Sequence, residues 1–570
     1  VRDLLLEEVA KLREGDFDEK LIEATINNYK MQLMRSFEEN DSRAILYVYS
    51  FISGADWADE VARIDRMSKI TKQDVVEWAN KYLGPESYAI IYKREGKDPD
   101  EQKIAAPKIT PIVTNRDSQS EFLSEIQTSQ VQPIEPVFVD YKKDMSQFEA
   151  QPGIDVLYKK NETNDIFTLI YVFNTGTEND PALNLAFNYL SYLGTDKMTA
   201  EEIASEMYDI ACSFYMNAGA NQSSIQITGL SENMGKAMEI VEGLIAGAKP
   251  DEAILENLKG DMLKSRADAK LNQSRCFGAL QRYLFYGGDF IRRTTLTDPA
   301  LQALTSEQLL AKIGGLMGKQ HEVLYYGPQK ETEIKSALAE HHKVAADLQP
   351  LEKKFSALLP TDANKVVLAQ YDAKQLYYLQ FSNRGEKFDV AADPEITLYN
   401  EYFGGGMNTI VFQEMREARG LAYSAWATLA TPSNANGDYS YYAFIATQND
   451  KMQKAVEAFD DIINNMPESE KAFGIAKEAL VSRLRTERTV KDGVLWSYLR
   501  ARDLGLDAPR DKQIFEKVQS MTLDDVKAAQ QKWVKGRKYV YGILGDIQDL
   551  DLNYLKTLGP IQTVSQEEIF

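Results

Sequence analysis

The chain has 570 residues, 44% of them hydrophobic, and its 86 Asp and Glu residues outnumber 65 Lys and Arg residues to give a formal net charge of −21. This composition is typical of an ordinary globular protein with several domains. It excludes a disulfide framework, because Cys212 and Cys276 are the only cysteines. We expect both thiols to be buried and free, with a reactive thiol or a single bridge as the alternatives.

The acidic balance argues against nucleic acid and anionic membrane surfaces as partners and favours peptides or cationic small molecules. No apolar run is long enough to predict a membrane-spanning helix. The chain starts at Val1 without an initiator Met and without a signal-peptide pattern. We therefore expect it to be a fragment of a longer polypeptide, a view that its internal repeats favour over a processed product.

Three stretches of the chain share one plan, in which a capped helix is followed by a β-rich strand. Thr71, Thr305 and Thr522 each stand three residues before an Asp or Gln that can complete a capping box. These threonines are 234 and 217 residues apart, and a second marker, an acidic helix opening, recurs at nearly the same spacings. The openings are Asp18-Glu19, Asp251-Glu252 and Ser469-Glu470, and the expected strands cover 88–92, 323–326 and 539–541.

The repeat divides the chain into two complete units, 151–350 and 351–550, preceded by 1–95, which matches only the rear half of a unit. The rest of its sheet is expected outside this chain, since half a sheet leaves an open edge. Residues 96–150 are polar and proline-rich and indicate a linker, and 551–570 form a C-terminal tail. Strands and helices without strict alternation predict an α+β fold of antiparallel sheets with helices packed on one face.

The segment from Tyr402 to Trp426 is the most informative one. An apolar stripe predicts a helix over about 408–419, which Gly420 is placed to end. Alternating residues then predict a strand from Tyr423 that returns through an Asn436-Gly437 turn as a hairpin. The stripe consists of Val411, Met415 and Ala418.

Arg416 near the end of this helix and Tyr423 at the start of the strand can converge on one point. A guanidinium and a phenol there could donate hydrogen bonds to a peptide carbonyl. On the residues alone, rim and packing roles are the more common explanation for both side chains.

Several familiar sites are excluded or disfavoured. The glycine run 404–406 lacks the Lys-Ser or Lys-Thr of a phosphate-binding loop, so we interpret it as a close turn before a helix. His341 and His342 are adjacent in a polar helical stretch, cannot chelate one ion together and are expected to face solvent. His321 opens a strand and has no partner at metal-ligand spacing. Neither a usual zinc site nor a Ser-His-Asp triad is predicted.

The segment GGGMNTIVFQEMREARGLAYS, residues 404–424, resembles the C-terminal signature of the pitrilysin/insulinase family of zinc metallopeptidases, which includes the processing peptidases. The family has four homologous α+β domains arranged as two bowls around a chamber, with an inverted H-x-x-E-H zinc motif in the first domain. The repeat plan extends this resemblance to nearly the whole chain.

A second segment, LAFNYLSYLGT at 185–195, resembles the zinc helix of the family but has lost its chemistry. Leu185, Asn188 and Tyr189 occupy the positions of the first His, the Glu and the second His. The resemblance therefore implies that 1–95 is the rear of domain two, 96–150 the hinge, 151–350 domain three and 351–550 domain four.

Carried over from the family, Arg416 and Tyr423 would bind the substrate carbonyl next to a zinc held by an N-terminal part outside this chain. The chain alone is then expected to be inactive, with no metal ligands, and its partners would be that zinc-binding part and peptide substrates. The alternative is a non-catalytic scaffold or peptide-binding subunit. The compartment stays open between bacterial periplasm, cytoplasm and mitochondrion.

Overall fold

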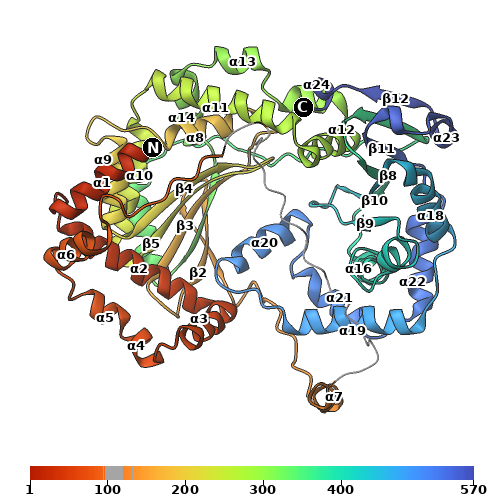
Figure 1. Ribbon diagram of the computed structural model, residues 1–570, viewed down its shortest axis with the longest axis horizontal. Helices are drawn as coiled ribbons and strands as arrows, with labels where there is room; N and C mark the ends of the chain where they lie inside the picture. Colours follow the sequence, from red (N-terminus) through yellow and green to blue (C-terminus); the bar gives the residue numbers. More distant parts are fainter. Residues whose placement is uncertain (94–95, 97–119, 131) are drawn as a thin grey trace. The chain divides into compact units, whose positions relative to one another are not determined.

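The computed structural model describes residues 1–93, 96, 120–130 and 132–570. They form two compact units, one of residues 1–23 and 61–135 and one of residues 24–60 and 136–570 (Figure 1). Residues 97–119 and 131 of the predicted linker lie outside the described residues, and its described part includes helix α7 (Glu121–Thr128) and most of strand β1 (Ser146–Gln151). None of the helices in the described ranges has the length and apolar content needed to cross a bilayer.

The first unit is helical. α1 (Arg2–Glu14) and α6 (Lys72–Tyr82) contact each other, and Thr71 makes the predicted capping box at the start of α6. The strand predicted at 88–92 is wrong, because these residues pair with no strand in the described part of the chain. Its counterparts in both complete repeats are central strands, so a neighbour on each side is what makes this segment a strand. The unit also contains α5 (Arg63–Met67).

The second unit contains two six-stranded sheets. The first sheet has the order β1-β2-β6-β3-β5-β4, with β2 and β6 parallel and the other pairs antiparallel. β3 is apolar along nearly its whole length because both faces of the sheet are covered at this central position. The further strands are β2 (Ile154–Lys160), β3 (Ile166–Phe173), β4 (Cys212–Ala218), β5 (Ser223–Leu230) and β6 (His321–Gly327).

The second sheet has the order β12-β7-β11-β8-β10-β9 and repeats this plan in the five strands from β7 to β9, with β7 and β11 parallel. Its other edge differs, because β12 is parallel to β7 whereas β1 is antiparallel to β2. The predicted tail, 551–570, supplies the edge strand β12 and so belongs to this sheet. The strands are β7 (Lys365–Gln370), β8 (Gln375–Lys387), β9 (Ala422–Ala430), β10 (Asp438–Gln448), β11 (Val540–Gly545) and β12 (Ile561–Val564).

Equivalent helices pack on the inner face of each sheet. α8 (Leu183–Leu190), α10 (Met234–Gly247) and α14 (Ser306–Leu316) share a core with the first sheet. α16 (Asp393–Phe403), α18 (Met452–Asn464) and α22 (Leu523–Ala529) do so with the second. The capping boxes predicted at Thr305 and Thr522 are confirmed.

The outer face of each sheet is covered by a helix from the other repeat. α12 (Gln273–Thr294), which follows the first sheet's β5, packs its buried residues on β7, β8 and β11 of the second sheet. α20 (Gly493–Asp503), from the second repeat, packs on β2, β3 and β6 of the first sheet. The predicted α+β fold with mainly antiparallel sheets is confirmed. The details differ, because each sheet contains parallel pairs and helices cover both of its faces where the sequence predicted one. In Figure 1, α12 lies beside β8 and β11.

The two cysteines are buried and free as predicted.

The remaining helices connect these layers. α2 begins in the first unit and continues into the second, where its last turn hydrogen-bonds to the first sheet's loops through Glu38 and Asn164. These helices are α2 (Lys20–Glu38), α3 (Asn40–Ser53), α4 (Trp57–Val61), α9 (Ala200–Asp209), α11 (Glu252–Lys270), α13 (Asp298–Ala303), α15 (Glu331–His341), α17 (Ile410–Phe412), α19 (Glu470–Thr486), α21 (Arg510–Val518), α23 (Leu552–Leu558) and α24 (Gln566–Ile569).

Candidate substrate-contact site

The predicted helix over 408–419 is present but changes type along its length. α17 runs into a π-helical turn, Gln413–Ala418, and Gly420 ends it with a φ of 57°. Val411 and Met415 are buried as the stripe predicts, whereas Ala418 is exposed. The wider π-turn explains this difference, because it rotates later residues away from the core face.

Tyr423 is the extra residue of a β-bulge at the start of β9. Ser424 pairs with Ala446 of β10 and Ala422 pairs with Thr447, so Tyr423 has no opposite residue. Bulges re-aim a side chain and are common next to functional sites. The side chain of Tyr423 is 77% exposed, on an edge strand whose neighbouring residues Ala425 and Ala427 are buried.

Arg416 lies directly against Tyr423, so the two predicted residues do come together. The guanidinium carbon of Arg416 is 4.5 Å from the Tyr423 ring centroid and 4.9 Å from that of Phe412. Arg416 Nη1 also donates to the Tyr423 carbonyl oxygen over 3.3 Å, and Nε lies 3.6 Å from Glu417. These contacts hold the guanidinium between two aromatic rings while its side chain stays 35% exposed, which leaves N–H groups for a carbonyl ligand.

An open pocket of about 470 Å³ lies beside β9, between the end of α16, the glycine run and the strand. Asn400 of α16 occupies part of the strand edge, since its side-chain amide exchanges two 2.9 Å hydrogen bonds with the backbone of Leu429. Gly404 passes close to both neighbours, since a Cβ there would lie 2.3 Å from the Asn400 carbonyl oxygen of α16 and 2.9 Å from the Ala427 carbonyl oxygen of β9. The glycine run is therefore a close turn, as the sequence predicts, and it follows α16.

The segment that resembles the zinc helix of the family forms α8, and most of its residues are part of the core. Leu185 and Tyr189 are buried, while Asn188 is exposed. The Tyr189 hydroxyl donates to Ser306 Oγ over 2.7 Å and accepts from the Asp251 backbone N–H over 2.7 Å. An aliphatic side chain, an amide and a phenol already used in the core do not fit a zinc ion. No group of three or more His, Cys, Asp or Glu residues suited to a metal occurs among the described residues.

The histidine predictions are wrong in one respect. His342 is buried, and its Nε2 lies 2.8 Å from Nε2 of His321, whose Nδ1 lies 2.8 Å from the Lys319 carbonyl oxygen. His342 Nδ1 lies 2.6 Å from Oε1 of the buried Glu242. Burial, together with the nearby His342, lowers the pKa of His321 to about 4.

This hydrogen-bonded row was missed because α15 ends at His341, so His342 leaves the helix and turns inward. Its partners come from β6 and α10, which sequence spacing does not relate. The signal available in the sequence was the scarcity of histidine itself, since two of only three in the chain face each other.

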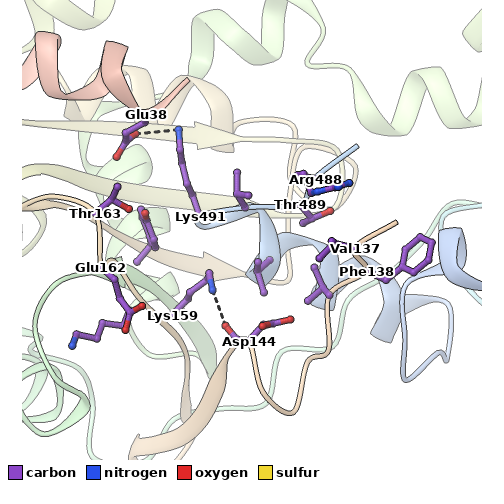
Figure 2. A pocket seen from close by; sticks show the side chains of 15 residues that line it. Glu38, Val137, Phe138, Asp144, Lys159, Glu162, Thr163, Arg488, Thr489 and Lys491 are labelled. Atoms are coloured by element: carbon purple, nitrogen blue, oxygen red, sulfur yellow. Dashed lines mark hydrogen bonds and ion pairs between the residues drawn. The ribbon is translucent and has the colours of Figure 1, made fainter. Parts of the chain in front are cut away.

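A second cavity, of about 430 Å³, lies in the larger unit beside the end of α2 (Figure 2). Two of its lysines are already engaged, because Lys491 pairs with Glu38 over 3.1 Å and Lys159 donates to the Asp144 carbonyl oxygen over 3.0 Å. Lys491 also has a φ of 56°, a strained conformation that the pairing with Glu38 helps to hold. The cavity joins elements of both repeats and offers no obvious reactive group.

Comparison with known proteins finds a matching family and relatives of the chain. Residues 321–480, which include Arg416 and Tyr423, match the family described as "Peptidase M16 inactive domain". An uncharacterized zinc protease of Streptomyces coelicolor is 23% identical over 266 residues, which are 43% of this chain and 56% of that protein. One of Rickettsia bellii is 22% identical over 312 residues, 52% of this chain and 70% of that protein. The chain spans about half the length of the Streptomyces relative.

Solved structures share the fold. A peptidase M16 inactive domain from Pseudomonas fluorescens aligns with a TM-score of 0.56 and 18% identity, over 70% of this chain and 98% of that one. The periplasmic protease PqqL from Escherichia coli aligns with a TM-score of 0.54 and 13% identity, over 95% of this chain and 63% of that one. The ferredoxin protease FusC, solved with Arabidopsis ferredoxin, aligns with a TM-score of 0.58 and 12% identity, over 95% and 60%.

Proposed function

This chain belongs to the M16, or pitrilysin/insulinase, zinc peptidases and carries their inactive domain, and we propose that it is the part of such an enzyme that holds the substrate without holding the metal. Zinc and its general base lie in an N-terminal part, and the two parts enclose peptides in a chamber. Residues 1–95, 151–350 and 351–550 are the rear of domain two, domain three and domain four, joined at the hinge 96–150.

The observation that carries this proposal is the pairing of Arg416 with Tyr423 on an exposed bulge. A buried pair would be explained by packing, but Tyr423 is largely exposed and adds little to the core. Its phenol and the remaining N–H groups of Arg416 can both donate to one substrate carbonyl. Such donors are worth most where charge develops on that oxygen during hydrolysis.

The proposal is tested with Tyr423→Phe in the assembled enzyme. The substitution removes one hydroxyl from an exposed ring, so folding and zinc content are expected to stay unchanged. Turnover of a peptide substrate is expected to fall about 100-fold, the effect of losing one oxyanion-type donor. A peptide-cleavage assay measures the turnover, and metal analysis of the same sample measures the zinc content.

Tyr215→Phe is the matched control, because Tyr215 is also an exposed strand tyrosine, on the edge strand β4 of the other sheet. It should cleave peptides at the wild-type rate. Wild-type turnover in Tyr423→Phe would remove Tyr423 from the mechanism. A fall in Tyr215→Phe of the same size would mean that loss of any exposed strand hydroxyl has this effect.

A second candidate function is a non-catalytic scaffold or peptide-binding subunit. It is favoured by α8, where the positions of the zinc ligands have become core residues such as Leu185 and Tyr189. The two candidate functions require different sequences in the part of the protein outside this chain. An intact H-x-x-E-H motif and bound zinc in the native protein support the peptidase, and their absence supports the scaffold.

A further inference from the structure

His321, His342 and Glu242 form a buried row of side chains in the first repeat, and the proposed function does not use them. His321 starts β6, Glu242 lies in α10, and His342 is the first residue after α15. From β3, Phe173 packs against the His321 ring and Tyr171 against the His342 ring, at centroid distances of 4.6 and 4.2 Å. The row is thus shielded from bulk water, so its polar atoms have to satisfy one another.

The direction of every hydrogen bond in the row follows from its first member. The backbone carbonyl of Lys319 can only accept, so His321 Nδ1, 2.8 Å away, carries a hydrogen. Burial keeps His321 neutral at pH 7, and its Nε2 is then a bare acceptor to which His342 Nε2 donates over 2.8 Å. The 2.6 Å contact between His342 Nδ1 and Glu242 Oε1 needs one further proton. Two neutral imidazoles and a carboxylate do not supply it.

This further proton belongs to His342. A carboxylic acid is about 100-fold more acidic than an imidazolium in water. Donation from Nε2 to His321 stabilises the charged ring further, since hydrogen bonds made by the charged form favour it. The imidazolium and the Glu242 carboxylate cancel, so the row buries no net charge.

The row lies where the chain leaves the first repeat. His342 begins a connector, residues 342–364, that leads from α15 to β7 of the second sheet. The connector is attached again at Gln349, whose N–H donates to the Gly318 carbonyl oxygen over 2.9 Å and whose carbonyl accepts from the Gln320 N–H over 2.8 Å. Both attachments use the segment 318–321, which runs into β6. The row and this pairing therefore hold the start of the connector together.

We propose that the row stores one proton on His342 and acts as an acid-sensitive latch on the connector. At neutral pH each donor in the row faces an acceptor. A second proton, taken up by His321 Nε2, places its N–H opposite that of His342 across 2.8 Å and leaves a net positive charge in the core. The latch then opens, and residues 342–349 separate from the segment 318–321.

The other titratable groups around the row do not offset this charge. Tyr171 stays a neutral phenol, because burial and the nearby Glu242 raise its pKa well above the usual value. Glu322, the next residue of β6, points to the other face of the sheet and is paired there with an arginine of α20 over 2.8 Å. His341 lies outside the row at the end of α15, with its Nε2 3.9 Å from a carboxylate of the same helix.

The stored proton is tested by NMR of the 570-residue chain with nitrogen-15 in its histidine rings, at pH 7.5. The chain has three histidines, so the variants His341→Gln and His321→Gln assign the signals. Both ring nitrogens of His342 are expected to carry a hydrogen, whereas His321 should carry one on Nδ1 alone. A bare nitrogen on His342 would overturn the stored proton.

The latch is tested by hydrogen–deuterium exchange of residues 343–350 at pH 6 and pH 4.5, corrected for the intrinsic pH dependence of exchange. An imidazole in water is mostly protonated already at pH 6, so this interval isolates the second proton, on His321. With the pKa of His321 at about 4, exchange should be roughly 20-fold faster at pH 4.5. Equal corrected rates would overturn the latch, as would the same acceleration in 540–545 of β11, which would indicate global unfolding.

Glu242→Gln removes the carboxylate that faces the stored proton. Residues 343–350 should then exchange about tenfold faster than in the wild type already at pH 6, because a hydrogen bond to a charged group is lost. Glu239→Gln, at an exposed position of the same helix, is the matched control and should exchange as the wild type does. Wild-type exchange in Glu242→Gln would also overturn the latch. If Glu242→Gln does not fold, the two wild-type measurements decide, and none of them depends on the proposed function.

Discussion

The two complete repeats arrange five strands in the same order, β2-β6-β3-β5-β4 and β7-β11-β8-β10-β9, and have equivalent inner helices, yet they differ at the edge formed by β4 and β9. In the first repeat, β4 pairs with β5 in an unbroken register, and Tyr189 of the nearby α8 is fixed in the core. In the second, the corresponding edge strand β9 contains a bulge, and a π-turn precedes it. Local irregularities on a common framework separate an edge with regular pairing from one whose bulge exposes Tyr423 next to Arg416.

Tyr189 of the first repeat contributes to the stability of the core, whereas Tyr423 of the second repeat is exposed to solvent. In the first repeat the buried phenol beside this edge is hydrogen-bonded, as Tyr189 of α8 is with Ser306 and Asp251, while Tyr215 on β4 itself is exposed. The irregular edge gives up pairing at one residue, and its side chain contributes little to the core. Substitution of the buried Tyr189 should therefore affect folding, and substitution of the exposed Tyr423 should affect activity.

The largest effect is expected from Tyr189→Ala. It opens a cavity in a tight core and leaves the Ser306 and Asp251 partners without the phenol, so it should lower the free energy of unfolding by about 4 kcal/mol. Tyr423→Ala is the comparison and should change that free energy by no more than about 0.5 kcal/mol, because the side chain is exposed. Urea denaturation followed by circular dichroism measures both. Equal losses in the two variants would refute the distinction drawn here.

The next effect is pH dependence, with opposite signs in the two repeats. His321 has its pKa lowered to about 4 by burial and by His342, so the unfolded chain takes up this proton near pH 6.5 while the native state does not. Stability should fall as the pH drops from 6.5 towards 4, by roughly 3 kcal/mol in total. In the second repeat, burial and the nearby Glu457 raise the pKa of Asp460 to about 6. The native state then binds this proton first, and stability should rise as the pH falls from 6 towards 4.

Single variants separate these opposing contributions. His321→Gln should lose less stability on acidification than the wild type, and Asp460→Asn should lose more. Denaturation midpoints at several pH values between 4.5 and 7 provide the readout. If both variants follow the wild-type profile, neither group titrates as its burial requires.

The smallest effect is expected from alanine at two corresponding glycines. A Cβ at Gly404 would lie 2.3 Å from the Asn400 carbonyl oxygen, and one at Gly194 would lie 2.7 Å from the Met198 carbonyl oxygen. Each substitution should cost about 2 kcal/mol of stability, because backbone atoms must move. Only Gly404→Ala displaces the turn that leads to Arg416, so only this variant should also lower peptide turnover in the assembled enzyme. Denaturation and turnover assays on both variants check the contrast.

Much of the framework could be predicted because its signals are local. The capping boxes at Thr305 and Thr522 and the helix, glycine and strand around Gly420 each depend on residues within one or two turns. That Leu185 and Tyr189 supply no zinc ligands can also be read from side-chain chemistry alone. The proximity of Arg416 and Tyr423 followed from a spacing of seven residues across one turn.

The tertiary structure decided what depends on residues far apart in the chain. Whether 88–92 forms a strand depends on flanking strands, and whether His342 faces solvent depends on Glu242 and His321. The exchange of α12 and α20 is likewise invisible in either helix, since an apolar stripe does not state which sheet will cover it. The sequence by itself thus determined where the repeated helices and strands lie. Which elements pack together was decided by the tertiary structure, because burying apolar surface is favourable whether the contacting residues are near or far apart in the chain.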